Sequence, residues 1–68
     1  MATYLVEAVD TYGEDLLYIL KSKREAVAAA KIEAENQRVS GGNGPKFIEV
    51  SKWNYVTQER EGVGKVRI

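Results

Sequence analysis

The sequence predicts an α+β fold: a small antiparallel sheet of three or four strands with one helix packed on one face, in the order ββαββ. Strong helix formers fill the middle of the chain, from Ser22 to about Arg38. Segments rich in β-branched and aromatic residues precede and follow this stretch, and glycine-containing turns separate them. With 68 residues, the chain has room for one domain, spanning residues 1–68.

The chain begins with a predicted β-hairpin. Residues 3–12 alternate as a half-buried strand does. One face would carry Tyr4, Val6 and Ala8, and the other Leu5, Glu7 and Val9. Residues 10–15 contain Gly13 among acidic residues and are predicted to form the turn. Residues 16–21 are predicted to form the second strand, because the apolar run is short and a new helix begins directly after it.

The helix has clear start and stop signals. Ser22 and Glu25 form a capping box, in which the Ser22 hydroxyl accepts a hydrogen bond from the Glu25 amide. We expect the helix to span residues 23–38. Residues 40–45 cannot continue it, and they overlap the glycine-rich segment 41–46. This segment leads from a helix into a strand, the reverse of a phosphate-binding loop, and we interpret it as a connector.

One stripe of the predicted helix carries small side chains. Its members are Ala26, Val27, Ala30 and Ala34. If this stripe faces the sheet, the helix axis lies close to the strands, and the large core side chains must come from the sheet. Ile32 lies on the opposite side with Ala28 and Val39. It is either an isolated exposed residue or part of a second apolar stripe that contacts a partner.

The C-terminal part predicts a second hairpin. Residues 46–52 form the predicted third strand, and residues 53–55 either continue it or turn it. Residues 55–59 and 64–68 are predicted as further strands around a turn at Glu61 and Gly62.

Charge is balanced over the chain, with ten basic and ten acidic residues. This balance argues against a dedicated nucleic-acid binder. Residues 1–21 hold four acids and one lysine, whereas residues 46–68 hold five basic and three acidic residues. The asymmetry favours pairing of charges across strands over a dipolar surface.

The inventory of reactive side chains is small. The chain contains no cysteine and no histidine, which excludes disulfides and the usual ligands of zinc. It also lacks the common catalytic base and thiol nucleophile, and Ser22 is committed to its cap. We therefore expect no enzyme activity, no catalytic residue, no cofactor and no metal site.

Two groups of residues are candidates for binding a partner. Trp53 and Tyr55, with Lys52, would form a stacking platform for single-stranded nucleic acid or a protein-binding hot spot, or would pack in the core or at its edge. Three acids near the first turn form either a solvated turn or a patch that docks a basic partner. These acids are Asp10, Glu14 and Asp15, which form a loose acidic cluster with Glu7.

The leading functional hypothesis is a small non-catalytic binding module that docks on another protein of unknown identity. A homodimer is plausible because a small sheet has open edges. The size also fits an accessory protein of a virus or mobile element that modulates a host protein. The alternative is a nucleic-acid-binding domain that uses the basic and aromatic C-terminal half. No signal peptide is recognisable and the longest uncharged apolar run is residues 16–20, so we expect a cytoplasmic protein without a membrane segment.

Overall fold

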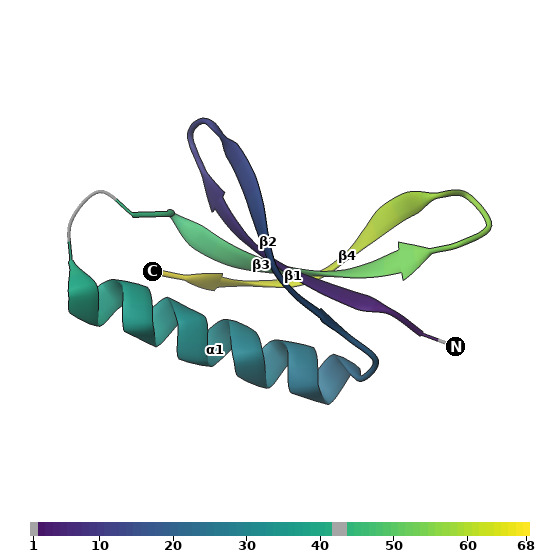
Figure 1. Cartoon of the computed structure of the whole chain (residues 1–68), viewed down its shortest axis with the longest axis horizontal. Coiled ribbons are helices and arrows are strands. Elements are labelled where there is room, and N and C mark those ends of the chain that lie inside the picture. The colour runs from purple at the N-terminus through teal and green to yellow at the C-terminus, as the bar shows by residue number, and fades with distance from the viewer. Residues whose placement is uncertain (1, 42–43) are drawn as a thin grey trace.

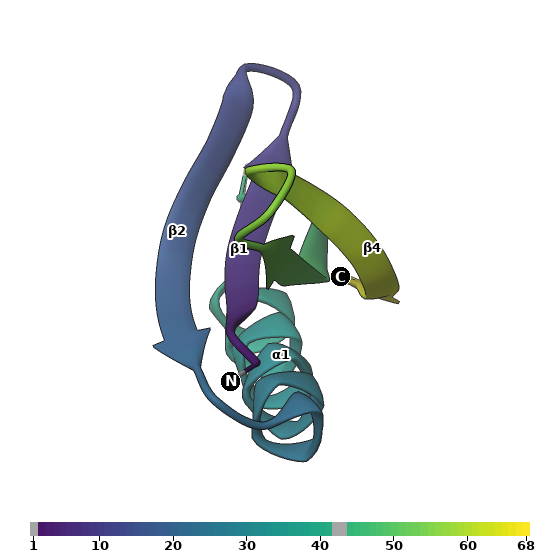
Figure 2. The ribbon, with the colours of Figure 1, turned by 90° about the vertical axis from the view of Figure 1, so that its right-hand side faces the viewer.

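The structure, a computed structural model, describes residues 2–41 and 44–68, which form four strands and one helix. The elements are β1 (Tyr4–Asp10), β2 (Gly13–Leu20), α1 (Lys23–Ser40), β3 (Phe47–Asn54) and β4 (Glu59–Arg67). The strands form one antiparallel sheet in the order β2-β1-β3-β4. Helix α1 lies along one face of this sheet (Figures 1 and 2). The predicted ββαββ fold is confirmed.

The core lies between α1 and the two central strands. Three alanines of α1 are fully buried against the sheet, and the large side chains come from β1 and β3. The central members of the cluster are Ala26, Ala30, Ala34, Val6, Ile48 and Val50. The predicted alanine stripe is therefore confirmed, although Val27 is only half-buried at its margin. Small side chains on the helix let larger ones on the strands fill the space beneath it.

Both ends of α1 follow the capping signals. The Ser22 hydroxyl accepts a hydrogen bond from the Glu25 amide at 3.4 Å. At the other end, Gly41 adopts a left-handed φ of +65°, and its amide donates to the Gln37 carbonyl. The helix reaches Ser40, two residues beyond the predicted end, so the prediction that Ser40 could not continue it is wrong. Of the predicted glycine-rich connector, residues 42–43 lie outside the described residues.

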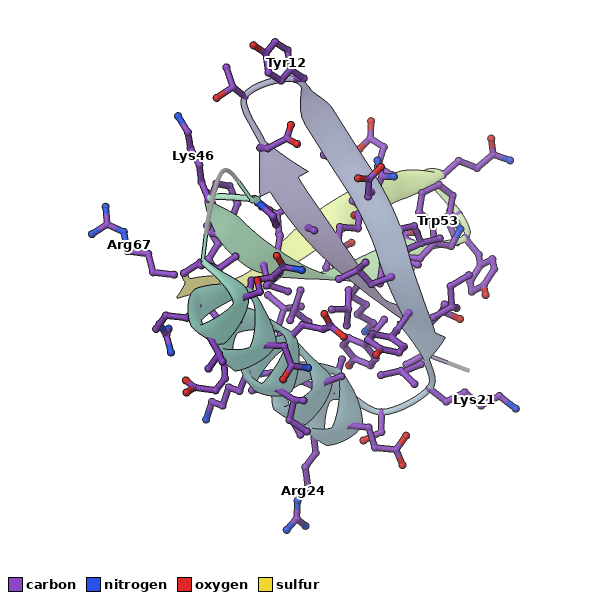
Figure 3. The ribbon with its side chains drawn as sticks, turned by 60° about the vertical axis from the view of Figure 1, so that its left-hand side comes forward. Tyr12, Lys21, Arg24, Lys46, Trp53 and Arg67 are labelled. Carbon is purple, nitrogen blue, oxygen red and sulfur yellow. The ribbon has the colours of Figure 1, made fainter. Side chains whose placement is uncertain are left out.

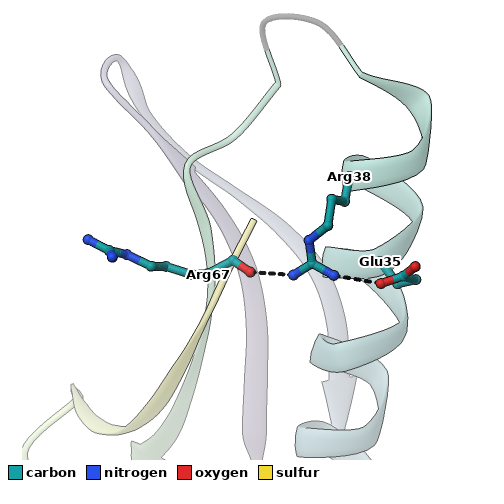
Figure 4. Close-up of polar contacts among 3 residues, drawn as sticks. All are labelled: Glu35, Arg38 and Arg67. Atoms are coloured by element: carbon teal, nitrogen blue, oxygen red, sulfur yellow. Dashed lines mark hydrogen bonds and ion pairs between the residues drawn. The ribbon is translucent and has the colours of Figure 1, made fainter.

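Arg38 fastens the last turns of α1 to the sheet (Figure 4). Its guanidinium donates to the Glu35 carboxylate one turn earlier and to the main-chain carbonyl of Arg67 at 2.8 Å. The Ile68 amide in turn donates to the Lys46 carbonyl. These bonds hold the end of β4 between β3 and the helix.

The first turn is shorter than predicted. The prediction of a turn over residues 10–15 is wrong, because β1 ends at Asp10 and β2 begins at Gly13. The Asp10 carboxylate accepts hydrogen bonds from the amides of Tyr12 at 2.7 Å and Gly13 at 3.0 Å. The aspartate side chain thus closes the turn within residues 11–12, and Glu14 and Asp15 become strand residues.

The second turn lies elsewhere than predicted. Strand β4 is continuous from Glu59 to Arg67, so the predicted strands at 55–59 and 64–68 around a turn at Glu61 and Gly62 are wrong. The turn occupies residues 55–58, and Asn54 organises it.

Asn54 accepts three backbone hydrogen bonds in this turn. Its side-chain oxygen accepts from the amides of Val56 and Thr57, and its carbonyl accepts from the Gln58 amide. Gln58 completes the turn with a left-handed φ of +58°. Gly62 instead lies within β4, opposite Ser51 and beside a shift in the β3–β4 register. A glycine inside a strand often marks such a bulge.

Candidate functional site

The residues predicted to bind a partner do not converge in space. Because β1 and β3 are antiparallel, their hairpin turns lie at opposite ends of the sheet. Figure 3 shows Tyr12 at the tip of the first hairpin and Trp53 on the second. The acids Asp10, Glu14 and Asp15 lie at one end, Lys52, Trp53 and Tyr55 at the other, and Ile32 lies on α1.

The two aromatic candidates do not share a regular strand. Strand β3 ends at Asn54, so Trp53 lies in the strand and Tyr55 in the turn. Trp53 is half-buried opposite Arg60 of β4, whereas Tyr55 is exposed and its hydroxyl contacts the Thr3 hydroxyl oxygen at 2.6 Å. The regular spacing on which a stacking platform depends is therefore absent at Tyr55.

The three predicted acidic residues also separate. Asp10 is occupied by its bonds to the turn amides. Glu14 and Asp15 are consecutive in β2 and therefore point to opposite faces of the sheet. Within the described residues 2–41 and 44–68, no group of three or more carboxylate, histidine or cysteine side chains could hold a metal ion.

An ion pair between Glu7 and Arg60 was not singled out from the sequence. Glu7 lies on the sheet face away from α1 and is only 2% exposed. Its Oε1 atom is 3.0 Å from the Arg60 Nε atom. This contact falls short of hydrogen-bond geometry, so among the described residues that oxygen has no hydrogen-bond partner. The pair joins the acidic residues 1–21 to the basic residues 46–68 across the intervening strand β3.

Burial raises the pKa of Glu7 above its ordinary value. The Arg60 guanidinium opposes this shift, whereas the Glu14 and Glu49 carboxylates add to it. Shifts in strand register next to Glu7 and Ser51, both buried, bend the sheet at this point. The sequence could have suggested the burial of Glu7, because alternation places it between Leu5 and Val9 on one strand face.

The second feature missed from the sequence is the exposure of β2. Four consecutive large apolar residues of this strand contact solvent, and Ile19 is 62% exposed. The others are Leu16, Leu17 and Tyr18. Within the described sheet, β2 pairs with β1 alone, so its outer edge presents unpaired backbone amides and carbonyls.

The exposed strand continues into a groove along α1. Tyr18 and Leu20 of β2 line this groove with Ala28, Ala29 and Ile32 of the helix, and its volume is about 380 Å³. Ile32 is 62% exposed. It is thus not an isolated apolar residue but extends an apolar surface from the strand to the helix. We call Leu16, Leu17, Tyr18, Ile19 and Ile32 the β2–α1 surface. Tyr18 and Ile32 lie on the sheet face that α1 covers, whereas Leu16 and Ile19 lie on the other face, and the free edge of β2 joins them.

A hydrogen bond fixes the middle of this surface. The Tyr18 hydroxyl donates to the Glu33 carboxylate at 2.9 Å. This bond and the negative charge of Glu33 raise the pKa of Tyr18. The hydrogen bond therefore holds the Tyr18 ring between β2 and α1.

Comparisons with known proteins do not assign this surface a role: no family model, curated protein or solved structure matches the chain. Helix α1, the helix of the described segments, is not long and apolar enough to cross a membrane.

Proposed function

We propose that this chain is a non-catalytic protein-binding module that docks on another protein chain through the β2–α1 surface. The observation that carries this proposal is the run of exposed apolar side chains on β2, from Leu16 to Ile19, on a strand with a free edge. Contiguous exposed apolar residues are typical of interaction sites. A free strand edge can also accept a strand from a partner through main-chain hydrogen bonds.

The other edge of the sheet provides a comparison within the same molecule. Strand β4 also lies at an edge, but five of its nine residues are charged. These residues are Glu59, Arg60, Glu61, Lys65 and Arg67. Charged side chains on edge strands discourage pairing with other chains. The contrast supports β2 as the docking edge.

The distribution of reactive groups supports a role without catalysis. The sequence has no histidine and no cysteine. The carboxylates near the first turn either close that turn or point to opposite faces of the sheet. Glu7, the most buried carboxylate, lies against Arg60 rather than in an enclosed cavity.

Affinity capture from host extract tests the proposal with matched variants. Ile19→Lys introduces a charge on the β2 part of the β2–α1 surface. Val56→Lys introduces the same charge at a residue that is 92% exposed in the β3–β4 turn. We expect the wild type and Val56→Lys to retain the same proteins, and Ile19→Lys to lose them.

Circular dichroism and thermal unfolding check that both variants fold, as we expect from their exposed positions. An unchanged set of captured proteins with folded Ile19→Lys would show that docking does not use this surface.

A further inference from the structure

We infer that the β2–α1 surface binds a second copy of this chain, with the two β2 strands paired antiparallel so that both sheets join into one. This inference rests on the proposed function, because it names the partner for the same surface.

The charges along β2 are arranged for antiparallel self-pairing. The strand begins with acids, Glu14 and Asp15, and the chain directly after it carries Lys21 and Lys23. Antiparallel pairing about Tyr18 brings the acidic start of β2 in one copy, with Asp15, near Lys21 of the other. A two-fold axis makes each such pair occur twice. Parallel pairing in register would instead oppose like charges.

The apolar residues also match in this arrangement. Antiparallel pairing about Tyr18 places the exposed run from Leu16 to Ile19 of one copy beside the same run of the other. Cross-strand apolar pairs are the main stabilising contacts between neighbouring strands. The exposed side chains that β2 presents to solvent are thus covered by their own symmetry mates.

The helix side of the edge adds contact area. Tyr18, Leu20 and Ile32 line one groove beside β2. A two-fold axis through the β2 pair brings this groove of each copy to the same seam, so Ile32 lies beside the new interface. A stable interface buries about 800 Å² on each partner, roughly a sixth of the 4923 Å² surface of this chain.

Strand β4 shows why charge order alone is not sufficient. Antiparallel self-pairing of β4 around Val63 would also oppose unlike charges, Glu59 with Arg67 and Glu61 with Lys65. Its centre, however, contains Gly62 and Gly64 and offers no exposed large apolar side chain. Of the two edge strands, β2 alone combines complementary charges with exposed large apolar side chains.

Sedimentation velocity of the purified full chain, from low to high micromolar concentration, tests the inference. We expect the wild type to form a dimer and Ile19→Lys to be a monomer. Asp15→Lys and Lys21→Asp should each weaken the dimer roughly tenfold, because each change affects both symmetry-related pairs. The double variant Asp15→Lys/Lys21→Asp should restore the dimer, since it exchanges the charges and keeps their pairing.

Lys65→Glu, on β4, serves as the control and should leave the dimer unchanged. A wild type that stays monomeric at every concentration overturns the inference. So does a dimer that resists Ile19→Lys, is not rescued by the double exchange, or is disrupted by Lys65→Glu.

The capture experiment separates this inference from the proposed function. If the wild type is monomeric but Ile19→Lys still loses captured proteins, the self-association is wrong and the docking function holds. If neither measurement responds to Ile19→Lys, both are wrong.

Discussion

Replacing Ala30 by leucine is expected to destabilise the protein strongly, because Ala30 is fully buried in the stripe of α1 that faces the sheet. The larger side chain would have to displace α1 or the strand residues beneath it. Overpacking of this kind costs about 1–3 kcal/mol. A folded chain of 68 residues has a free energy of unfolding of roughly 3–10 kcal/mol. The loss should therefore lower the midpoint of thermal unfolding by about 4–24 °C.

Ala28→Leu provides the matched control, because Ala28 is exposed on the same helix. The chemical change and its effect on helix propensity are the same, so we expect the free energy of unfolding to change by no more than about 0.5 kcal/mol. Urea unfolding at low protein concentration measures both variants. Equal effects of the two substitutions, or none from Ala30→Leu, would refute the close approach of α1 to the sheet.

Three further substitutions test individual contacts. Ser22→Ala removes the acceptor of the Glu25 amide and should cost about 1 kcal/mol in urea unfolding; an unchanged midpoint would contradict a role for this cap. Gln58→Gly should raise the free energy of unfolding by roughly 0.5–1 kcal/mol, because glycine adopts the left-handed φ of +58° without steric cost. A less stable glycine variant would contradict this. For Glu7, burial raises the folded-state pKa above the ordinary 4.5, so the folded state binds its proton more tightly. Its favourable contribution is complete below 4.5 and is lost as the pH rises through the folded-state pKa. The stability of Glu7→Gln relative to the wild type should therefore increase with pH across this range, and a pH-independent difference would count against the shift.

The helix and its buried face were predictable because their signals are local. Ser22 and Gly41 mark its ends through hydrogen bonds within one turn of the chain. The spacing of the alanines shows which face of the helix carries small side chains. Large side chains from the sheet must then fill the space beneath that face. The alternation of the first strand placed Val6 and Ala8 on one face, and the structure shows that this face packs against the helix.

The turns were harder to predict because polar side chains close them. The carboxylate of Asp10 and the amide of Asn54 bind the backbone two or three residues ahead. Glycine misled the prediction of the second turn, since Gly62 lies inside β4 beside a bulge. Asn54 was the better signal of this turn, because an asparagine side chain can accept hydrogen bonds from the backbone amides that follow it.

The candidate site depends on strand order, which the sequence does not encode locally. The apolar run of β2 reads as a buried strand, yet β2 lies at the sheet edge and β1, which contains Glu7, lies in the interior. The sequence singled out Ile32 as a candidate contact, but only the structure shows that Tyr18 and Leu20 lie beside it. Only the assembled sheet brings these residues together.

Amide hydrogen exchange at low and high protein concentration tests self-association through β2 most directly. Amides on the free edge of β2 should exchange quickly in dilute solution and become protected as the concentration rises, while those of β4 stay unchanged. Protection of β2 that does not depend on concentration, or protection that appears on β4 instead, would contradict pairing of two β2 strands.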